Sequence, residues 1–222
     1  MAAKTILTNN QRKILEIISQ DNSLTENFYL TGGTALAEFY LGHRLSEDLD
    51  FFSEKEFDSS TIAVFWQKHQ KSLGIKKVAY EQSFNRQLFF LKLKNETIKT
   101  EFTYFPFPRV EKKKKINKLD IDSLTDIAVN KIFTIYQKPR ARDFVDLYFI
   151  CSKQGWNIDD LARTAKSKFD WHIDPLLLGS QFLQATTVKD FPRMIIKTAN
   201  KDWQDFFKKQ AEMIGKTKVM KD

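Results

Sequence analysis

One segment, "FYLTGGTALAEFYLGHRLSEDLDFF" at residues 28–52, constrains the fold more than any other part of the chain. A short apolar run stops at Gly32 and Gly33, and good helix formers follow. An alternating run then places Asp48 and Asp50 on either side of a single leucine. Glycines permit positive φ angles and a close approach of the backbone to a ligand. The pattern therefore predicts a strand, a tight turn, a helix and a second strand in immediate succession.

The Gly-Gly turn allows two interpretations. Free backbone N–H groups and the helix dipole favour an anion at such a turn, and the hydroxyl of Thr34 could add a donor. The turn is not a Walker A loop, because no Gly-Lys-Ser/Thr follows, and it lacks the third glycine of the dinucleotide-binding fingerprint. Taken alone, the two glycines are better explained by a tight turn without a ligand.

The two aspartates indicate a metal site. Side chains alternate along a strand, so Asp48 and Asp50 project from one face, about 6–7 Å apart, and carboxylates suit hard cations such as Mg²⁺. In nucleotidyl transfer, two metal ions about 4 Å apart activate the attacking oxygen and stabilise the leaving pyrophosphate. Glu101 is the candidate third acid, since an acid within an apolar strand is costly unless paired or metal-bound. Pairing with Lys99 or Arg86 is its alternative role.

The remaining pattern predicts an α+β fold, a mixed sheet with helices followed by a helical bundle. Helical spacing at residues 8–20 and 59–74 alternates with strand-like runs that end in a meander over residues 75–105. "FPFP" and the lysine-rich "RVEKKKKINK" then predict a domain boundary or long surface loop. We expect domains at residues 1–110 and 111–222, the second built from helices near residues 122–137, 140–155, 157–169, 174–185 and 200–215.

Composition and charge limit the ligands and the cellular compartment that we expect for the protein. The 222 residues carry a net charge of +8, which attracts nucleic acid, nucleotides or anionic membrane, although a well-solvated surface explains the charge equally well. No window of 18 uncharged apolar residues predicts a membrane span. The start of the chain does not resemble a secretory signal. A single cysteine, Cys151, excludes an internal disulfide and fits a reducing compartment, so we expect a cytoplasmic protein.

At two places the residues resemble a known family. "GGTALAEFYLGHRLSEDLDFF" is similar to the signature of the nucleotidyltransferase AbiEii/AbiGii toxin family, a branch of the DNA polymerase β-type nucleotidyltransferase superfamily. Its motif positions correspond to Gly32, Gly33, Arg44, Ser46, Asp48 and Asp50. A second match consists of a lysine on one helix and an "R…RD…DL" pattern on the next, here Lys131, Arg140, Arg142, Asp143 and Asp146. The resemblance spans roughly residues 28–150, and it departs at the third acid, which is commonly aspartate and here is Glu101.

The resemblance implies a metal-dependent nucleotidyltransferase that uses an NTP. It implies catalytic roles for Asp48, Asp50, Glu101, Lys131 and Asp146. Mg²⁺ or Mn²⁺ would be held by Asp48, Asp50 and Glu101. The nucleotide would be bound by Gly32, Gly33, Thr34, Arg44, Ser46, Arg142 and Asp143. It further implies the toxin of a toxin–antitoxin pair, with a tRNA acceptor and a separate DNA-binding antitoxin.

Three alternatives remain open at this stage. From the residues alone, Arg142, Asp143 and Asp146 could form a surface ion-pair cluster of little energetic value. The protein could be a nucleotide-binding module without turnover. It could also transfer the nucleotide to a small molecule or to a protein side chain.

Overall fold

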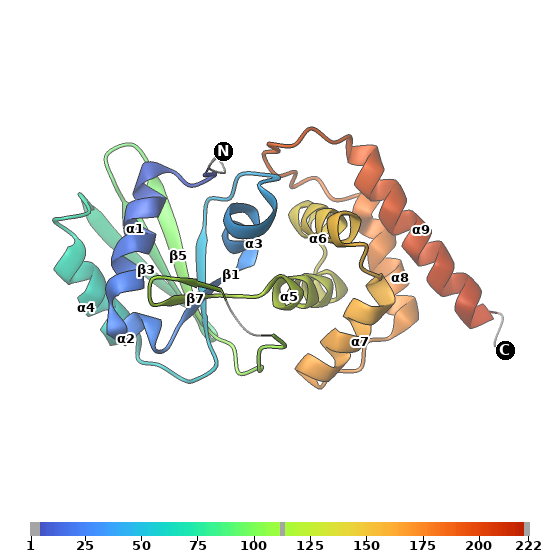
Figure 1. Cartoon of the computed structure of the whole chain (residues 1–222), viewed down its shortest axis with the longest axis horizontal. Helices are drawn as coiled ribbons and strands as arrows, with labels where there is room; N and C mark the ends of the chain where they lie inside the picture. The colour runs from blue at the N-terminus through green and yellow to red at the C-terminus, as the bar shows by residue number, and fades with distance from the viewer. Residues whose placement is uncertain (1–4, 112–113, 220–222) are drawn as a thin grey trace. The chain divides into compact units, whose positions relative to one another are not determined.

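The computed structural model describes residues 5–111 and 114–219, and the chain divides into two compact units, Met1–Ser123 and Leu124–Asp222. The first unit contains a mixed β-sheet with helices, and the second contains helices (Figure 1). The predicted fold class is therefore confirmed. Among the described residues, no helix is both long enough and apolar enough to cross a membrane.

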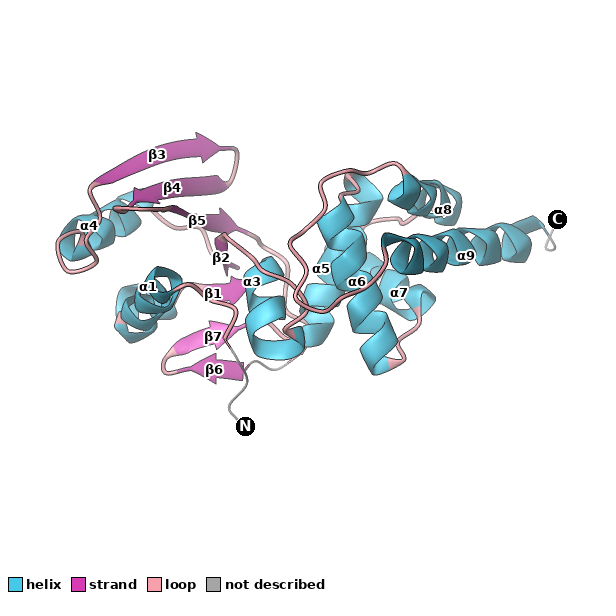
Figure 2. Cartoon of the chain, turned by 90° about the horizontal axis from the view of Figure 1, so that it is seen from above, coloured by secondary structure: helices cyan, strands magenta, loops and turns pink. Residues whose placement is uncertain are grey.

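The described part of the first unit forms one seven-stranded sheet in the order β3-β4-β5-β2-β1-β7-β6 (Figure 2). The strands are β1 Tyr29–Thr31, β2 Leu49–Ser53, β3 Lys77–Ser83, β4 Arg86–Lys92, β5 Thr97–Tyr104, β6 Lys114–Ile116 and β7 Leu119–Ile121. Neighbours β1 and β2 are antiparallel, whereas β2 and β5 are parallel. The meander that the sequence predicts corresponds to β3, β4 and β5.

One face of this sheet is the core of the first unit. Phe51 and Phe102 stack with ring centroids 4.9 Å apart, and Trp66 lies edge-on to Phe102 at 6.5 Å. Trp66 belongs to α4, Ser59–His69, which both views place on the same side of the strands as α1, Asn9–Gln20 (Figure 1 and Figure 2). A short α2, Asn22–Thr25, follows α1. Because side chains alternate along a strand, the residues between these apolar positions project from the opposite face.

The Gly-Gly turn leads directly into a helix, as predicted. Helix α3, Gly32–Leu36, continues without a break into the π-helical turn η1, Ala37–Leu41. The turn ends at Gly42, whose φ of 62° is left-handed. Single π-helical turns inside helices are rare, and nothing in the apolar spacing of this segment indicates one.

The lysine-rich stretch differs from the expectation of a surface loop or linker. Residues on either side of Asn117 form the hairpin of β6 and β7, and β7 pairs in parallel with β1. Leu119 and Ile121 are buried, so this strand is held by the core of the first unit. Lys112 and Lys113 of the lysine run lie outside the described residues.

The second unit is a bundle in which α5 contacts α6, α7 and α8. Its helices are α5 Leu124–Gln137, α6 Ala141–Gln154, α7 Ile158–Phe169, α8 Pro175–Leu183, the 3₁₀ turn η2 Gln184–Thr186, and α9 Asn200–Val219. Asn157 and Asp174 cap α7 and α8 by accepting backbone N–H bonds, and Gly155 ends α6 with a φ of 69°. Large buried rings from three helices fill the centre: Phe144, Phe182, Trp203 and Phe207.

Candidate active site

The two glycines of the turn are required by their neighbours. Gly32 has a φ of +74°, and a Cβ atom there would lie 2.5 Å from Oδ2 of Asp50. A Cβ atom at Gly33 would collide with the guanidinium of Arg44 and come within 3.2 Å of Oγ of Ser46. The turn therefore brings three of the predicted site residues directly against the backbone at the start of α3.

Thr34 connects the turn to the start of β2. Its side chain is fully buried, and its hydroxyl donates a hydrogen bond to the backbone carbonyl of Asp48. The hydroxyl that we expected as a donor to phosphate is therefore engaged within the protein. The amide of Gln11 donates to the carbonyls of Ser46 and Glu47, both at 3.0 Å, and so fixes the segment that precedes the acids.

The structure brings the three predicted acids together around one lysine. Strand β2 begins one residue after Asp48 and contains Asp50, which lies directly opposite Glu101 in the parallel pairing with β5. Nζ of Lys99 lies 2.9 Å from Oδ2 of Asp48 and 3.5 Å from Oε2 of Glu101. The pKa of Lys99 is raised. Burial alone would lower it, but the bond to Asp48 and the charges of all three carboxylates outweigh burial.

Glu101 is held by a second cation. Both of its carboxylate oxygens accept bonds of 2.6 Å from the guanidinium of Arg86, and Oε1 also accepts from Thr103 at 3.1 Å. Burial by itself would raise the pKa of Glu101, but the bonds and charge of Arg86, with the charge of Lys99, lower it. The side chain is only 7% exposed and stays ionised, so the pairing with Lys99 and Arg86 that we considered as its alternative role is present.

This site fits a divalent cation in donor chemistry but is not preassembled for one. Three converging carboxylates are the hard oxygen ligands that Mg²⁺ and Mn²⁺ prefer. Within residues 5–111 and 114–219, however, no three His, Cys, Asp or Glu side chains are arranged to hold a metal ion. Lys99 and Arg86 take up carboxylate oxygens that would serve as ligands. A cation bound at these oxygens would therefore compete with the two ion pairs.

The predicted residues of the second unit form a buried ion-pair cluster. Nζ of Lys131 lies 2.6 Å from Asp143 and 2.7 Å from Asp146, and Nε of Arg140 lies 2.7 Å from Asp143. Burial alone would raise the pKa of Asp143, but the charges of Lys131 and Arg140 lower it. Both aspartates are at most 1% exposed, so this is not the surface cluster that we considered. Arg142 is half-buried and, among the described residues, forms no ion pair with either aspartate.

The sequence indicated Lys99 and Arg86 as alternative partners of Glu101, but not that both bind it. Alternation along β5 places Lys99 and Glu101 on one face, which is a usable signal. Arg86 reaches Glu101 because it lies opposite Thr103 in the antiparallel pairing of β4 with β5. That register depends on the hairpin between the two strands, which residue spacing alone does not determine.

Comparison with known proteins shows the family and the fold of the chain. A profile described as nucleotidyl transferase AbiEii toxin, type IV toxin–antitoxin system, matches residues 13–216. An uncharacterised protein of Aquifex aeolicus (strain VF5) is 32% identical over 211 residues, covering 93% of this chain and 96% of that protein. The solved structure of JHP933 from Helicobacter pylori has a TM-score of 0.59 at 23% identity and covers 95% of this chain and 94% of its own. A second H. pylori structure also has a TM-score of 0.59, at 21% identity, with coverage of 97% and 99%.

The family match shows that this protein is a nucleotidyltransferase. The similarity to the two H. pylori structures shows the same fold. More particularly, the chain belongs to the AbiEii nucleotidyl transferase toxin family of type IV toxin–antitoxin systems. Membership of this family implies a nucleotide substrate and a separate antitoxin partner.

Proposed function

We propose that this nucleotidyltransferase moves a nucleoside monophosphate from an NTP to a hydroxyl group of tRNA, in a reaction that depends on Mg²⁺ or Mn²⁺. The observation that carries this proposal is the convergence of Asp48, Asp50 and Glu101 beside the Gly-Gly turn. In such an arrangement the carboxylates would hold a cation at the reacting phosphate, and the turn would bind the rest of the triphosphate.

Asp48 and Asp50 are the proposed ligands of the divalent cation, with Glu101 as the third. Glu101 would have to release at least one of its two bonds to Arg86 in order to bind a metal ion. When bound, the cation would lower the pKa of the attacking hydroxyl and neutralise charge on the phosphate oxygens.

The protein's own groups would bind and orient the triphosphate. Backbone N–H groups at Gly32 and Gly33 begin a helix, and Arg44 packs against the same turn, so both can face an anion. Ser46 and Thr34 support this turn, and the hydroxyl of Thr34 does so through the carbonyl of Asp48. We assign the turn and Arg44 to direct contact with the nucleotide, and Ser46 and Thr34 to holding the turn in position, since groups already in position lower the barrier without reorganisation.

Lys131 and Arg142 are proposed to act on the triphosphate, and Asp143 and Asp146 to hold Lys131. Nζ of Lys131 lies 2.6 Å from Asp143 and 2.7 Å from Asp146, and these two contacts fix its ammonium between the carboxylates. Those carboxylates also offset its charge. We therefore expect Lys131 to position a phosphate oxygen by hydrogen bonding more than to attract the nucleotide from a distance.

The net charge of +8 supports RNA as the acceptor, because a basic surface attracts polyanions. We propose that the protein acts as a toxin on tRNA in the cytoplasm. The buried free thiol of Cys151 is in keeping with a reducing compartment.

Transfer assays with labelled NTPs, Mg²⁺ and total RNA test the proposal. Label should appear on tRNA and disappear in the double variant Asp48→Asn, Asp50→Asn. Glu81→Gln is the matched control, because this acid of the same sheet is exposed, and it should retain activity. Label on a protein or a small metabolite would support the alternative acceptors. Tight NTP binding without any transfer would support the binding module.

A further inference from the structure

We propose that Lys99 is a positioning residue that acts as the built-in counter-ion of the acid cluster, and that a divalent cation binds by displacing its ammonium group from Asp48. The inference rests on the proposed cation-dependent function. It adds a competition between a side chain of the protein and the metal ion for the same carboxylate oxygens. The free protein would then keep its acids together without a metal ion and would bind divalent cations weakly.

The position of Lys99 supports this role. Its Nζ lies between two of the acids, 2.9 Å from Asp48 and 3.5 Å from Glu101. An ammonium and a divalent cation repel each other, so Lys99 at this position weakens the binding of a cation to the same carboxylates. The side chains of Lys99 and Asp48 are 24% and 32% exposed, which leaves the ammonium a way out into solvent.

The second cation of the site has a different geometry. Arg86 binds Glu101 through two parallel bonds of 2.6 Å, a planar arrangement that is specific and strong. Lys99 instead presents a compact charge on a flexible four-carbon chain and has one short contact, to Asp48. Of the two cations, Lys99 is therefore the one that leaves its carboxylate when a metal ion arrives, while Arg86 keeps one of its two bonds to Glu101.

Mn²⁺ binding to the full chain in the absence of nucleotide tests the competition. Free Mn²⁺ can be followed by electron paramagnetic resonance. Lys99→Met should tighten Mn²⁺ binding roughly tenfold or more, because one positive charge next to the ligands is removed. Lys99→Arg keeps the charge and should bind as weakly as the wild type. Lys92→Met, an exposed lysine on the neighbouring strand β4, is the matched control and should change nothing.

Chemical labelling gives a second readout that does not depend on catalysis. Acetylation of lysines in the native protein, mapped by mass spectrometry, should be slow at Lys99 without divalent cation. It should become several-fold faster when Mg²⁺ is added, while the labelling of Lys92 stays constant. An ammonium that stays on Asp48 would show no such acceleration.

The proposal is overturned if Lys99→Met binds Mn²⁺ no more tightly than the wild type, or if Mg²⁺ leaves the labelling of Lys99 unchanged. It is also overturned if the double variant Asp48→Asn, Asp50→Asn binds Mn²⁺ as well as the wild type, because the cation then lies elsewhere. If binding and labelling follow the expectation but no nucleotide is transferred, the displacement stands and the proposed function alone fails.

Discussion

At the scale of single residues, Gly32 links the backbone of the turn to the acid cluster. Its φ of +74° disfavours any side chain, and a Cβ atom would lie 2.5 Å from Oδ2 of Asp50. We expect Gly32→Ala to cost about 1–2 kcal/mol of stability through the left-handed backbone. Because it also pushes Asp50 aside, nucleotide transfer should fall roughly a hundredfold, since misplacement by about 1 Å has effects of this size. Thermal unfolding and initial rates with a labelled NTP measure the two effects separately.

Gly74 provides a control for backbone strain. Its φ of +66° is close to that of Gly32, but a Cβ atom there meets nothing within 4 Å. Gly74→Ala should therefore lose about 1–2 kcal/mol of stability and keep its transfer activity. Equal loss of transfer in both variants would show that strain, and not the collision with Asp50, explains the effect.

The same scale shows what residue spacing can predict about the site. Alternation along two strands was enough to expect Asp50 and Glu101 on the faces opposite their apolar neighbours, and the register of β2 with β5 places them directly opposite each other. The pairing of Glu101 with both Lys99 and Arg86 was foreseen only as an alternative to metal binding. Spacing could not decide between them, because the choice depends on long-range strand register.

At the scale of elements, the Lys131 cluster joins two helices of the bundle. Lys131 comes from α5, and its partners Asp143 and Asp146 come from α6. Lys131→Met would leave two buried carboxylates without their common cation, so we expect a loss of about 3–5 kcal/mol. Urea unfolding measures this loss. At temperatures where the variant stays folded, transfer should still fall, if Lys131 also contacts the phosphate as proposed.

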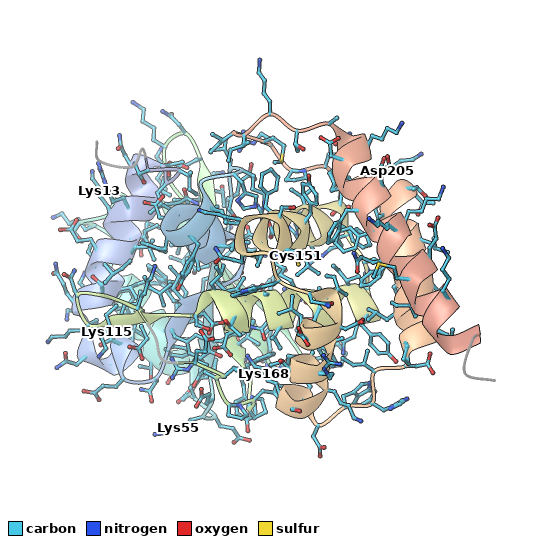
Figure 3. The ribbon with its side chains drawn as sticks, turned by 45° about the vertical axis from the view of Figure 1, so that its right-hand side comes forward. Lys13, Lys55, Lys115, Cys151, Lys168 and Asp205 are labelled. Carbon is cyan, nitrogen blue, oxygen red and sulfur yellow. The ribbon has the colours of Figure 1, made fainter. Side chains whose placement is uncertain are left out.

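Lys168 offers a matched control on neighbouring elements. It lies on α7, where Figure 3 labels it, and its Nζ is 2.7 Å from Asp126 on α5, with both side chains at most 1% exposed. Lys168→Met should lose stability to a similar extent, because it also removes the ammonium partner of a buried carboxylate. It should keep its transfer rate while folded. A comparable loss of transfer would mean that Lys131 acts only by stabilising the bundle.

The sequence predicted the helices of the second unit but not the strands β6 and β7, and the difference has a physical reason. Local signals located the helices of the second unit, since Asn157, Asp174 and Gly155 do cap them. The strands β6 and β7 were missed because Leu119 and Ile121 form too short an alternating run after the lysines. They become strands by pairing with β1, a contact distant in sequence. Tertiary pairing of this kind leaves little local trace.

At the scale of the whole molecule, both units depend on ionised buried carboxylates, so acid should destabilise the chain throughout. Glu101 in the first unit and Asp143 in the second have pKa values below their ordinary 4.5 and 3.8. Each stabilises the fold fully above its ordinary pKa, and this contribution is lost as the pH falls through the lowered pKa. Protonation also increases the positive charge, which already stands at +8. The free energy of unfolding should therefore decrease steadily from pH 5 to pH 2.

The first loss of stability at alkaline pH should come from the second unit. Burial raises the pKa of the Cys151 thiol on α6 from 9.0 to about 12 (Figure 3). The folded state therefore keeps its proton while the unfolded chain loses it, and this contribution to stability is present below pH 9 and declines as the pH rises toward 12. Urea unfolding monitored by tryptophan fluorescence should show highest stability between about pH 5 and 8. Cys151→Ala should remove the thiol-dependent part of the alkaline decline and leave the acid decline intact, whereas an unchanged alkaline decline would contradict this assignment.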